Sequence, residues 1–295
     1  MALRINITER QRRIGAELRK ARRQAGIAVG EGGRLIGMSG PHLTHVESGR
    51  TGIPSQRLRE LLKAYGYKNE EYIDALVDLA ESKGRGWWTE YRKSLPQRSL
   101  DLAELESRAT AIQSYETLLI PGLLQTEAYM RALFCSSRPG ASPTEIDTLV
   151  RYRRARQQIL ADGSPTAIHA VIHEAALRII VGSSDVMRDQ LTHLLRSAQR
   201  PGTTIQILPF DAGARAWFGT PLLILGAGVP GLETVIVEHP AEPLRLGDIE
   251  SIARYRSTFD SLSRNSLPRV TADGSPGSHE RRDSWGLIHH VLYTY

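Results

Sequence analysis

Glycines divide the first eighty residues into short segments, and the spacing of these glycines constrains the fold most. An apolar stripe with helical spacing predicts a helix over residues 9–25, which Gly26 ends. The stripe consists of Ile14, Leu18, Ala21 and Ala25. A short second helix should end at Gly37, a third should run from Ser39 to Gly49, a fourth should start near Ser55, and a fifth should cover 69–83. Five short helices in so short a stretch predict a compact all-α bundle.

The third of these helices, within the stretch SGPHLTHVESGR at 39–50, has an apolar and a polar face. Advancing 100° per residue, with Leu43 and Val46 facing the core, separates the two faces. The polar face then carries Pro41, Thr44, His45 and Ser48, with His42 on the flank. A polar helix that follows a short helix and a tight glycine turn is typical of a helix-turn-helix recognition helix. Because the two histidines do not lie side by side, paired metal ligation is poor geometry.

Positive charge is concentrated in this segment. Residues 1–66 hold 13 Lys and Arg against 5 acids, a net of +8. Of the chain totals of 38 basic and 32 acidic residues, 25 and 27 remain beyond residue 66, a net of −2. A basic segment on a near-neutral body indicates a polyanion partner, with a solvated helix face as the alternative.

These patterns predict binding to double-stranded DNA, with the following roles. Thr44, His45 and Ser48 are the base-reading candidates, while Ser39 caps the helix and Pro41 and His42 shape its start. Arg50 and Arg57 are the candidates for phosphate contacts. Glu47 would be repelled by phosphate, so it is expected to brace the bundle through Arg19 or Arg22. A homodimer on half-sites one helical turn apart is a further possibility.

Beyond the stretch KGRGWW the sequence mixes helices and strands, which predicts an α+β domain with a partly antiparallel sheet. Helices are expected over 101–112, 123–135, 143–161, 184–198 and 248–263, and strands over 166–173, 203–210, 221–225 and 233–238. The predicted organisation is a DNA-binding domain at 1–84, an effector or partner-binding domain at 85–267, and a flexible tail at 268–295, whose end could dock as a strand.

Several other features have simpler explanations than a catalytic or metal site. The GAGVPG stretch at 226–231 fits a dinucleotide fingerprint, but a β-branched run follows it, which favours a hairpin loop. His169, His173 and Glu174 lack a third ligand at recognisable spacing, so no metal and no cofactor are expected. An aromatic group, Trp87, Trp88 and Tyr91 with Trp217, is a candidate effector pocket, with core packing as the alternative. No nucleophile elbow is present, so an enzyme is not expected.

Composition is consistent with a cytoplasmic protein. The single cysteine, Cys135, can form no intrachain disulfide and is expected to be a packed thiol. The charged N-terminus lacks the pattern of a signal peptide, and no apolar run reaches the roughly 20 residues that span a bilayer. No membrane association is expected.

Residues 12–66 resemble the xenobiotic-response-element (XRE) family of helix-turn-helix regulators, through LRKARRQAG and IGMSGPHLTHVESGRTGIPS. Residues 87–266 resemble the C-terminal domain of a large actinobacterial group of such regulators, called WhiJ-like or antitoxin-like. The segments GWWTEY, IPGLLQTEAY, RRARQQIL and IQILPFDAG carry this resemblance. It implies a lambda-repressor-like bundle, a transcription regulator and a small protein partner.

The second helix departs from the family pattern. Ala28 and Val29 replace the usual Thr and DNA-contacting Gln, and Gly32-Gly33 replaces Leu-Ala. A lost Thr cap and each interior glycine cost about 1 kcal/mol, so this helix is expected to be frayed in isolation. Two rival functions therefore stay open: an antitoxin-like protein-interaction module with a degenerate helix-turn-helix, and an enzyme in the C-terminal domain.

Overall fold

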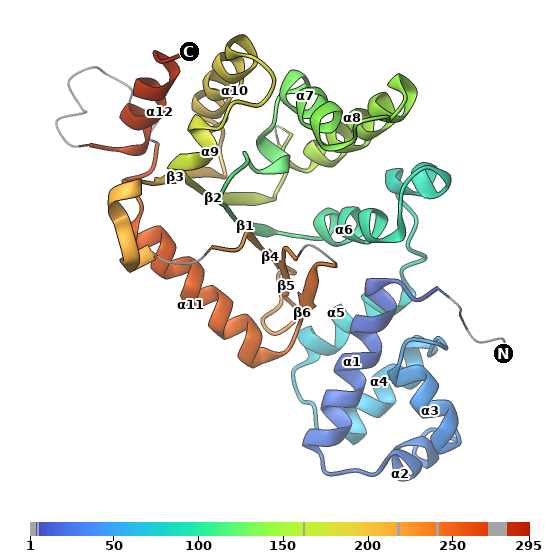
Figure 1. Cartoon of the computed structure of the whole chain (residues 1–295). Coiled ribbons are helices and arrows are strands. Elements are labelled where there is room, and N and C mark those ends of the chain that lie inside the picture. The colour runs from blue at the N-terminus through green and yellow to red at the C-terminus, as the bar shows by residue number, and fades with distance from the viewer. Residues whose placement is uncertain (1–3, 5, 162, 217–218, 240–241, 271–281) are drawn as a thin grey trace. The chain divides into compact units, whose positions relative to one another are not determined.

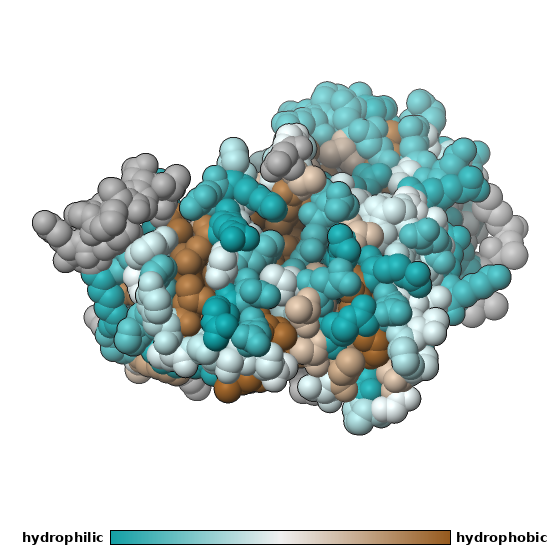
Figure 2. Space-filling model, turned by 90° about the horizontal axis from the view of Figure 1, so that it is seen from above, coloured by the Kyte–Doolittle hydropathy of each residue, from teal (hydrophilic) through white to brown (hydrophobic). Residues whose placement is uncertain are grey.

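The structure, a computed structural model, describes residues 4, 6–161, 163–216, 219–239, 242–270 and 282–295. The chain divides into two compact units, Met1–Leu105 and Glu106–Tyr295. The first compact unit extends about twenty residues past the boundary expected at 84/85, and that boundary stays a prediction. Within the described residues, no helix combines the length and the apolar composition needed to cross a bilayer. Figure 2 shows hydrophilic residues over most of the face seen from above, with apolar residues exposed in separate patches.

The first unit is helical, as the sequence predicts (Figure 1). Its helices are α1 (Glu9–Gln24), α2 (Val29–Arg34), α3 (Gly40–Glu47), α4 (Ser55–Ala64) and α5 (Glu70–Glu81), followed by the 3-10 helix η1 (Trp87–Lys93) and by α6 (Gln97–Ser107), which crosses into the second unit. Gly26, Gly37 and Gly49 all have positive φ values, which explains why each ends a helix. The five-helix bundle is confirmed, and the second helix forms despite its glycines.

The second unit is built on a six-stranded mixed sheet in the order β3-β2-β1-β4-β5-β6. The strands are β1 (Ala111–Glu116), β2 (Ala167–His173), β3 (Thr203–Leu208), β4 (Leu222–Gly226), β5 (Thr234–Val237) and β6 (Leu244–Leu246). The first three are parallel, and β4, β5 and β6 continue the sheet with antiparallel pairs. The α+β class with a partly antiparallel sheet is therefore confirmed. The GAGVPG stretch joins β4 to β5 as the hairpin that the sequence favours.

Helices surround this sheet (Figure 1). They are α7 (Glu127–Ser137), α8 (Pro143–Gln157), α9 (Glu174–Arg178), α10 (Ser184–Ser197), α11 (Ile249–Asn265) and α12 (Ser284–Leu292), with 3-10 turns η2 (Gly122–Leu124), η3 (Gln158–Leu160) and η4 (Phe210–Ala216). Helix α11 packs on one face, where Ile252, Phe259 and Leu262 join an apolar cluster with Tyr115 and Val171. This cluster fixes α11 against the sheet because it buries large apolar side chains.

Four expectations differ from the structure. The helix expected over 101–112 ends at Ser107, and β1, the strand that joins the two halves of the sheet, begins at Ala111. Strand β6 has no counterpart among the predicted strands. The flexible tail expected over 268–295 contains α12, whose Ile288 and Val291 are fully buried, so its end is a packed helix instead of a strand. The part of that tail at 271–281 lies outside the described residues. Cys135 is exposed on α7, so it is not a packed thiol.

Candidate nucleic-acid interface

Helix α3 presents the two faces that its sequence predicts. Leu43 and Val46 are buried, with 0% and 2% of their surface exposed. Pro41 and Thr44 are exposed, and the remaining polar residues of the ridge are half-buried. We call this ridge the α3 ridge: Pro41, His42, Thr44, His45 and Ser48. The Ser39 hydroxyl accepts a hydrogen bond from the His42 amide at 3.3 Å, so the predicted N-cap is confirmed.

Two hydroxyl groups of the α3 ridge already donate their protons to the backbone. Thr44 Oγ1 donates to the Gly40 carbonyl at 3.1 Å, and Ser48 Oγ donates to the His45 carbonyl at 3.1 Å. In this conformation their oxygen atoms can act as acceptors toward a donor such as a base amino group, and the Thr44 methyl group can contact a thymine methyl. The imidazole of His45 makes no hydrogen bond to another described residue.

The acidic residue of α3 faces inward. Glu47 is 4% exposed, and its Oε1 and Oε2 atoms accept from Arg22 Nε at 2.6 Å and from a second Arg22 nitrogen at 3.0 Å. Arg19 Nε lies 3.5 Å from Glu47 Oε2. The predicted bracing role is confirmed, because these ion pairs tie α3 to α1. The hydrogen bond that Arg22 donates to Glu47 also raises the pKa of Arg22, which keeps that guanidinium charged.

A second buried carboxylate on α1 is neutralised in the same way. Glu17 is 3% exposed, and it forms ion pairs with Arg13 at 2.9 Å and with Lys20. It also accepts a hydrogen bond of 2.6 Å from the Tyr72 hydroxyl on α5. Burial beside this carboxylate raises the pKa of Tyr72, so the phenol remains a donor. The two buried acids thus hold the bundle together and add no negative charge to its surface.

Other arginines of the basic segment have no acidic partner among the described residues. They are exposed and comprise Arg23, Arg34, Arg50 and Arg57. Arg57 lies in the first turn of α4, where Pro54 at the N-cap provides no side-chain cap. A cation in a first turn is disfavoured by the helix dipole. A phosphate at this position would be favoured by the helix dipole and by the Arg57 charge. Sequence patterns indicate Arg50 and Arg57 but not Arg23 and Arg34, because their lack of partners is visible only in three dimensions.

Glycines bring α2 and α3 into close contact. A Cβ atom on Gly33 would lie 2.6 Å from the Met38 carbonyl oxygen, and one on Gly32 would lie 2.6 Å from the Tyr65 hydroxyl. A Cβ atom on Gly40 would lie 3.1 Å from the Gly30 Cα. The Gly32-Gly33 departure therefore has a packing reason: Gly33 lies against the short turn between these helices, and Gly32 lies against the Tyr65 side chain.

The proposed aromatic effector group is only partly assembled in the described residues. Trp87 contacts Trp88 and Tyr91 edge-on, with ring centroids 5.9 and 6.1 Å apart. Trp88 is buried against Gly86, where a Cβ would lie 2.3 Å from its ring. All three belong to the first unit, and Trp217 lies outside the described residues. Their role in binding an effector stays a prediction.

The histidines considered as metal ligands have separate partners. His169 Nε2 lies 2.7 Å from Gln206 Oε1, and His173 Nδ1 accepts from the Ala175 amide at 3.1 Å as the N-cap of α9. Glu174 pairs with Arg178 at 2.8 Å and accepts from the Phe210 amide at 3.0 Å. Across the residues that the structure describes, no group of three His, Cys, Asp or Glu side chains converges on one point.

Comparison with known families gives two matches. Residues 99–272, more than half of the chain, match the family described as a domain of unknown function, DUF5753. The chain belongs to the DUF5753 family. In this DUF5753 protein, residues 13–76 also match a family described as a helix-turn-helix domain, which covers α2, α3 and the turn between them. Searches of curated proteins and of solved structures gave no match.

Part of the sequence that carried the resemblance has a structural role in this DUF5753 protein. The loop IPGLLQT, residues 120–126, runs through a network of amide side chains. Gln125 Nε2 donates to the Ile120 carbonyl at 2.7 Å, and Gln157 Nε2 donates to the Gln125 carbonyl at 2.7 Å. Gln190 accepts from the Thr126 amide at 2.7 Å and donates to the Leu124 carbonyl at 2.8 Å. These bonds satisfy backbone groups that the irregular loop would leave unpaired, so this motif shapes the fold.

Proposed function

We propose that the protein is a sequence-specific DNA-binding transcription regulator of the XRE type that acts in the cytoplasm. The observation that carries the proposal is the distribution of charge on and around α3. The helix turns its carboxylate, Glu47, inward onto Arg22 and leaves an outward ridge of neutral polar side chains. Unpaired arginines in the same bundle supply positive charge for the phosphates. A helix presented in this way suits the major groove.

The proposed contacts fall into two classes. Thr44, His45 and Ser48 would read base edges, with the two hydroxyl oxygens as acceptors and the His45 imidazole as donor or acceptor. Arg50, just beyond α3, and Arg57, at the uncapped start of α4, would hold phosphates. Val29 stands where the XRE family that the chain resembles has a DNA-contacting Gln, and its apolar side chain cannot make that contact. More of the affinity for DNA should therefore depend on these two arginines.

The test is DNA selection followed by titration at several salt concentrations. We expect the wild type to enrich one site and its affinity to fall steeply with salt. The Thr44→Ala and His45→Ala double variant should lose preference for that site, at about 1–3 kcal/mol for each base-reading side chain removed. The Arg50→Gln and Arg57→Gln double variant should bind all sequences more weakly, with a salt slope smaller by about 2.

Arg264→Gln, an exposed and unpaired arginine on α11, is the matched control for charge. It should leave the affinity and the salt slope unchanged. Enrichment of no site, or retention of site preference by the Thr44 and His45 variant, would refute the proposed reading face.

For the C-terminal domain we propose a binding role and no catalysis. One candidate occupant is a small protein partner, as in the antitoxin-like group that the chain resembles. The exposed apolar residues Ile180 and Phe210, 60% and 55% exposed, support such a contact near the ends of α9 and β3. A partner that binds the helix-turn-helix instead of DNA would give affinity nearly independent of salt, which separates the two functions. Whether the protein forms a homodimer is tested by measuring its mass in solution with and without DNA.

A further inference from the structure

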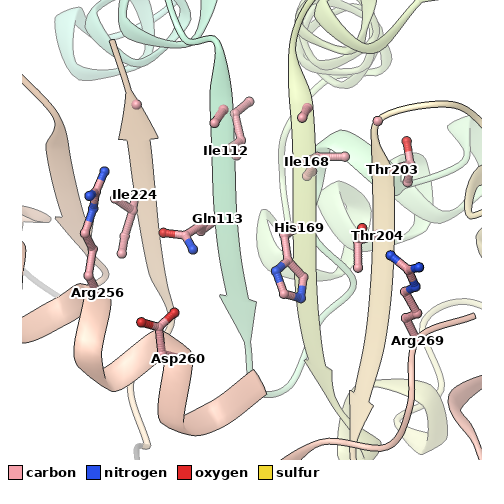
Figure 3. A pocket seen from close by; sticks show the side chains of 14 residues that line it. Ile112, Gln113, Ile168, His169, Thr203, Thr204, Ile224, Arg256, Asp260 and Arg269 are labelled. Carbon is pink, nitrogen blue, oxygen red and sulfur yellow. The ribbon is translucent and has the colours of Figure 1, made fainter. Parts of the chain in front are cut away.

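A polar groove of about 670 Å³ lies where β1, β2 and β3 begin, on the face of the sheet that α11 covers (Figure 3). Its polar lining consists of Gln113, His169, Thr203, Thr204, Arg256, Asp260 and Arg269. Its volume is within the range of about 300–1,000 Å³ typical of small-molecule sites. Figure 3 shows Gln113, Asp260 and His169 between the two arginines, one at each end of the groove.

The face of the sheet under α11 changes from apolar to polar at this groove, where the His169 ring also packs edge-on against Phe259 with centroids 5.0 Å apart. Side chains alternate along a strand, so Gln113 shares its face with Tyr115, and His169 shares its face with Val171. Tyr115 and Val171 belong to the apolar cluster under α11. The same face therefore changes from apolar to polar within two residues on adjacent strands, where the register pairs Gln113 with His169.

The hydrogen bonds around His169 show which nitrogen of its ring is left to accept a hydrogen bond from a ligand. Gln206 Nε2 donates to the carbonyl oxygens of Ser263 and Leu267, at 3.2 and 3.0 Å. Its Oε1 must therefore be the acceptor, and it receives the Ser263 hydroxyl at 2.7 Å and His169 Nε2 at 2.7 Å. In the neutral imidazole the proton then lies on Nε2, so Nδ1 is left as an acceptor. Burial lowers the pKa of His169, which favours this neutral form.

Several other polar side chains of the groove lack a hydrogen-bond or ion-pair partner among the described residues, although the Asp260 charge opposes the lowering of the His169 pKa by burial. Among the described residues, the side chains of Gln113, Thr204, Asp260 and Arg269 form no hydrogen bond or ion pair. Arg256 differs, because it pairs with the buried Glu233 at 2.8 Å. The groove thus offers acceptors in its centre and an uncommitted guanidinium at one end.

We propose that this groove binds a small polyol that carries one anionic group, a phosphate or a carboxylate. The Asp260 carboxylate, His169 Nδ1 and the Gln113 amide oxygen accept hydroxyl protons, and Arg269 pairs with the anion. Asp260 repels an anion at the centre, so the charged group lies at the Arg269 end. This inference rests on the proposal that the C-terminal domain binds a ligand, and it does not require DNA binding.

The test is calorimetric titration of the full chain with glucose 6-phosphate, gluconate, glucose and inorganic phosphate. The two anionic polyols should bind at least about tenfold more tightly than glucose or phosphate alone. Which of glucose 6-phosphate and gluconate binds more tightly then shows whether the natural ligand carries a phosphate or a carboxylate. Arg269→Gln should weaken the anionic polyols at least about tenfold without changing glucose, and Asp260→Asn should weaken all three polyols but not phosphate.

Arg264→Gln and Asp189→Asn are the matched controls, since both residues are exposed and lie outside the groove. Thermal unfolding of each variant shows whether it is folded. The inference would be overturned if neither anionic polyol bound at millimolar concentration. It would also be overturned if the Arg269 and Asp260 variants bound the polyols as tightly as the wild type does. DNA affinity measured on the same samples separates the two proposals: polyol binding without DNA binding refutes only the regulator, and the reverse result refutes only this site.

Discussion

A single carboxylate, Glu47, connects the stability of the bundle to its surface charge. Both of its oxygens accept from Arg22, and it is almost completely buried. Removing one partner of a buried pair leaves the other charge uncompensated, which typically costs about 3–5 kcal/mol. Glu47 is therefore a residue of α3 whose loss should act first on folding.

We expect Glu47→Ala to lower the free energy of unfolding by about 3 kcal/mol, as measured by urea denaturation. The Arg22→Met and Glu47→Leu double variant should recover part of that loss, because it leaves no buried charge. A double-mutant cycle gives the coupling between the two residues. Equal stability of Glu47→Ala and wild type would show that the pair contributes nothing.

Glu116, the last residue of β1, should make the stability of the fold depend on pH. Burial and the nearby Glu238 raise its pKa to about 8, against the opposing effect of Arg153 and Arg156. Arg156 also pairs with Glu106 at 2.6 and 2.8 Å. The folded state therefore favours the protonated carboxyl group, whose ordinary pKa is 4.5.

A raised acid pKa stabilises the fold below pH 4.5, and that stabilisation is lost as the pH rises toward about 8. Glu116→Gln cannot ionise, so its stability relative to wild type should increase across this interval. Urea denaturation of both proteins between pH 4.5 and 8 measures the difference. Glu250→Gln, which removes an exposed acid on α11, is the control for the loss of one carboxylate. A stability difference that is independent of pH would contradict the assignment.

At the scale of the element, two glycines of α2 differ in how closely they pack against the rest of the first unit. Gly33 faces the Met38 carbonyl oxygen, whereas a Cβ on Gly30 would meet nothing within 4 Å. Both lie in α2, so their helix propensities are comparable. Only contact with α3 distinguishes them.

We expect Gly33→Ala to destabilise the first unit by about 1–3 kcal/mol, because the backbone of the turn must shift. Gly30→Ala should stabilise it by about 0.5–1 kcal/mol through helix propensity alone. Thermal unfolding followed by circular dichroism measures both. If the two substitutions changed the melting temperature equally, close packing would not be the reason for Gly33.

The elements that sequence could predict are those with regular periodicity. Helices α1 to α5 combine apolar stripes with terminating glycines, so their order and approximate ends were predictable. Strand β1 was not predictable in this way because its alternate residues include Gln113, which lines the polar groove instead of the core. Helix α12 was hidden although Leu287, Ile288 and Val291 have helical spacing, because the polar residues before it suggested a tail.

At the scale of the whole molecule, the two candidate sites differ in what sequence can predict. The α3 ridge lies within ten consecutive residues, so helical periodicity was enough to place it. The polar groove gathers residues from β1, β2, β3, β4, α11 and the segment after α11. Sequence spacing carries no sign of such a site, because only the strand order brings these residues together.

The position of β1 has a consequence for synthesis of the chain. Its parallel neighbour β2 begins at Ala167, but its antiparallel neighbour β4 begins only at Leu222, after β3 and α10 have been made. Until then one side of β1 presents unpaired amide and carbonyl groups, the kind of edge at which nascent chains associate. A ribosome pausing between residues 208 and 222 would prolong that vulnerable period, whereas rapid translation through β4 would close it.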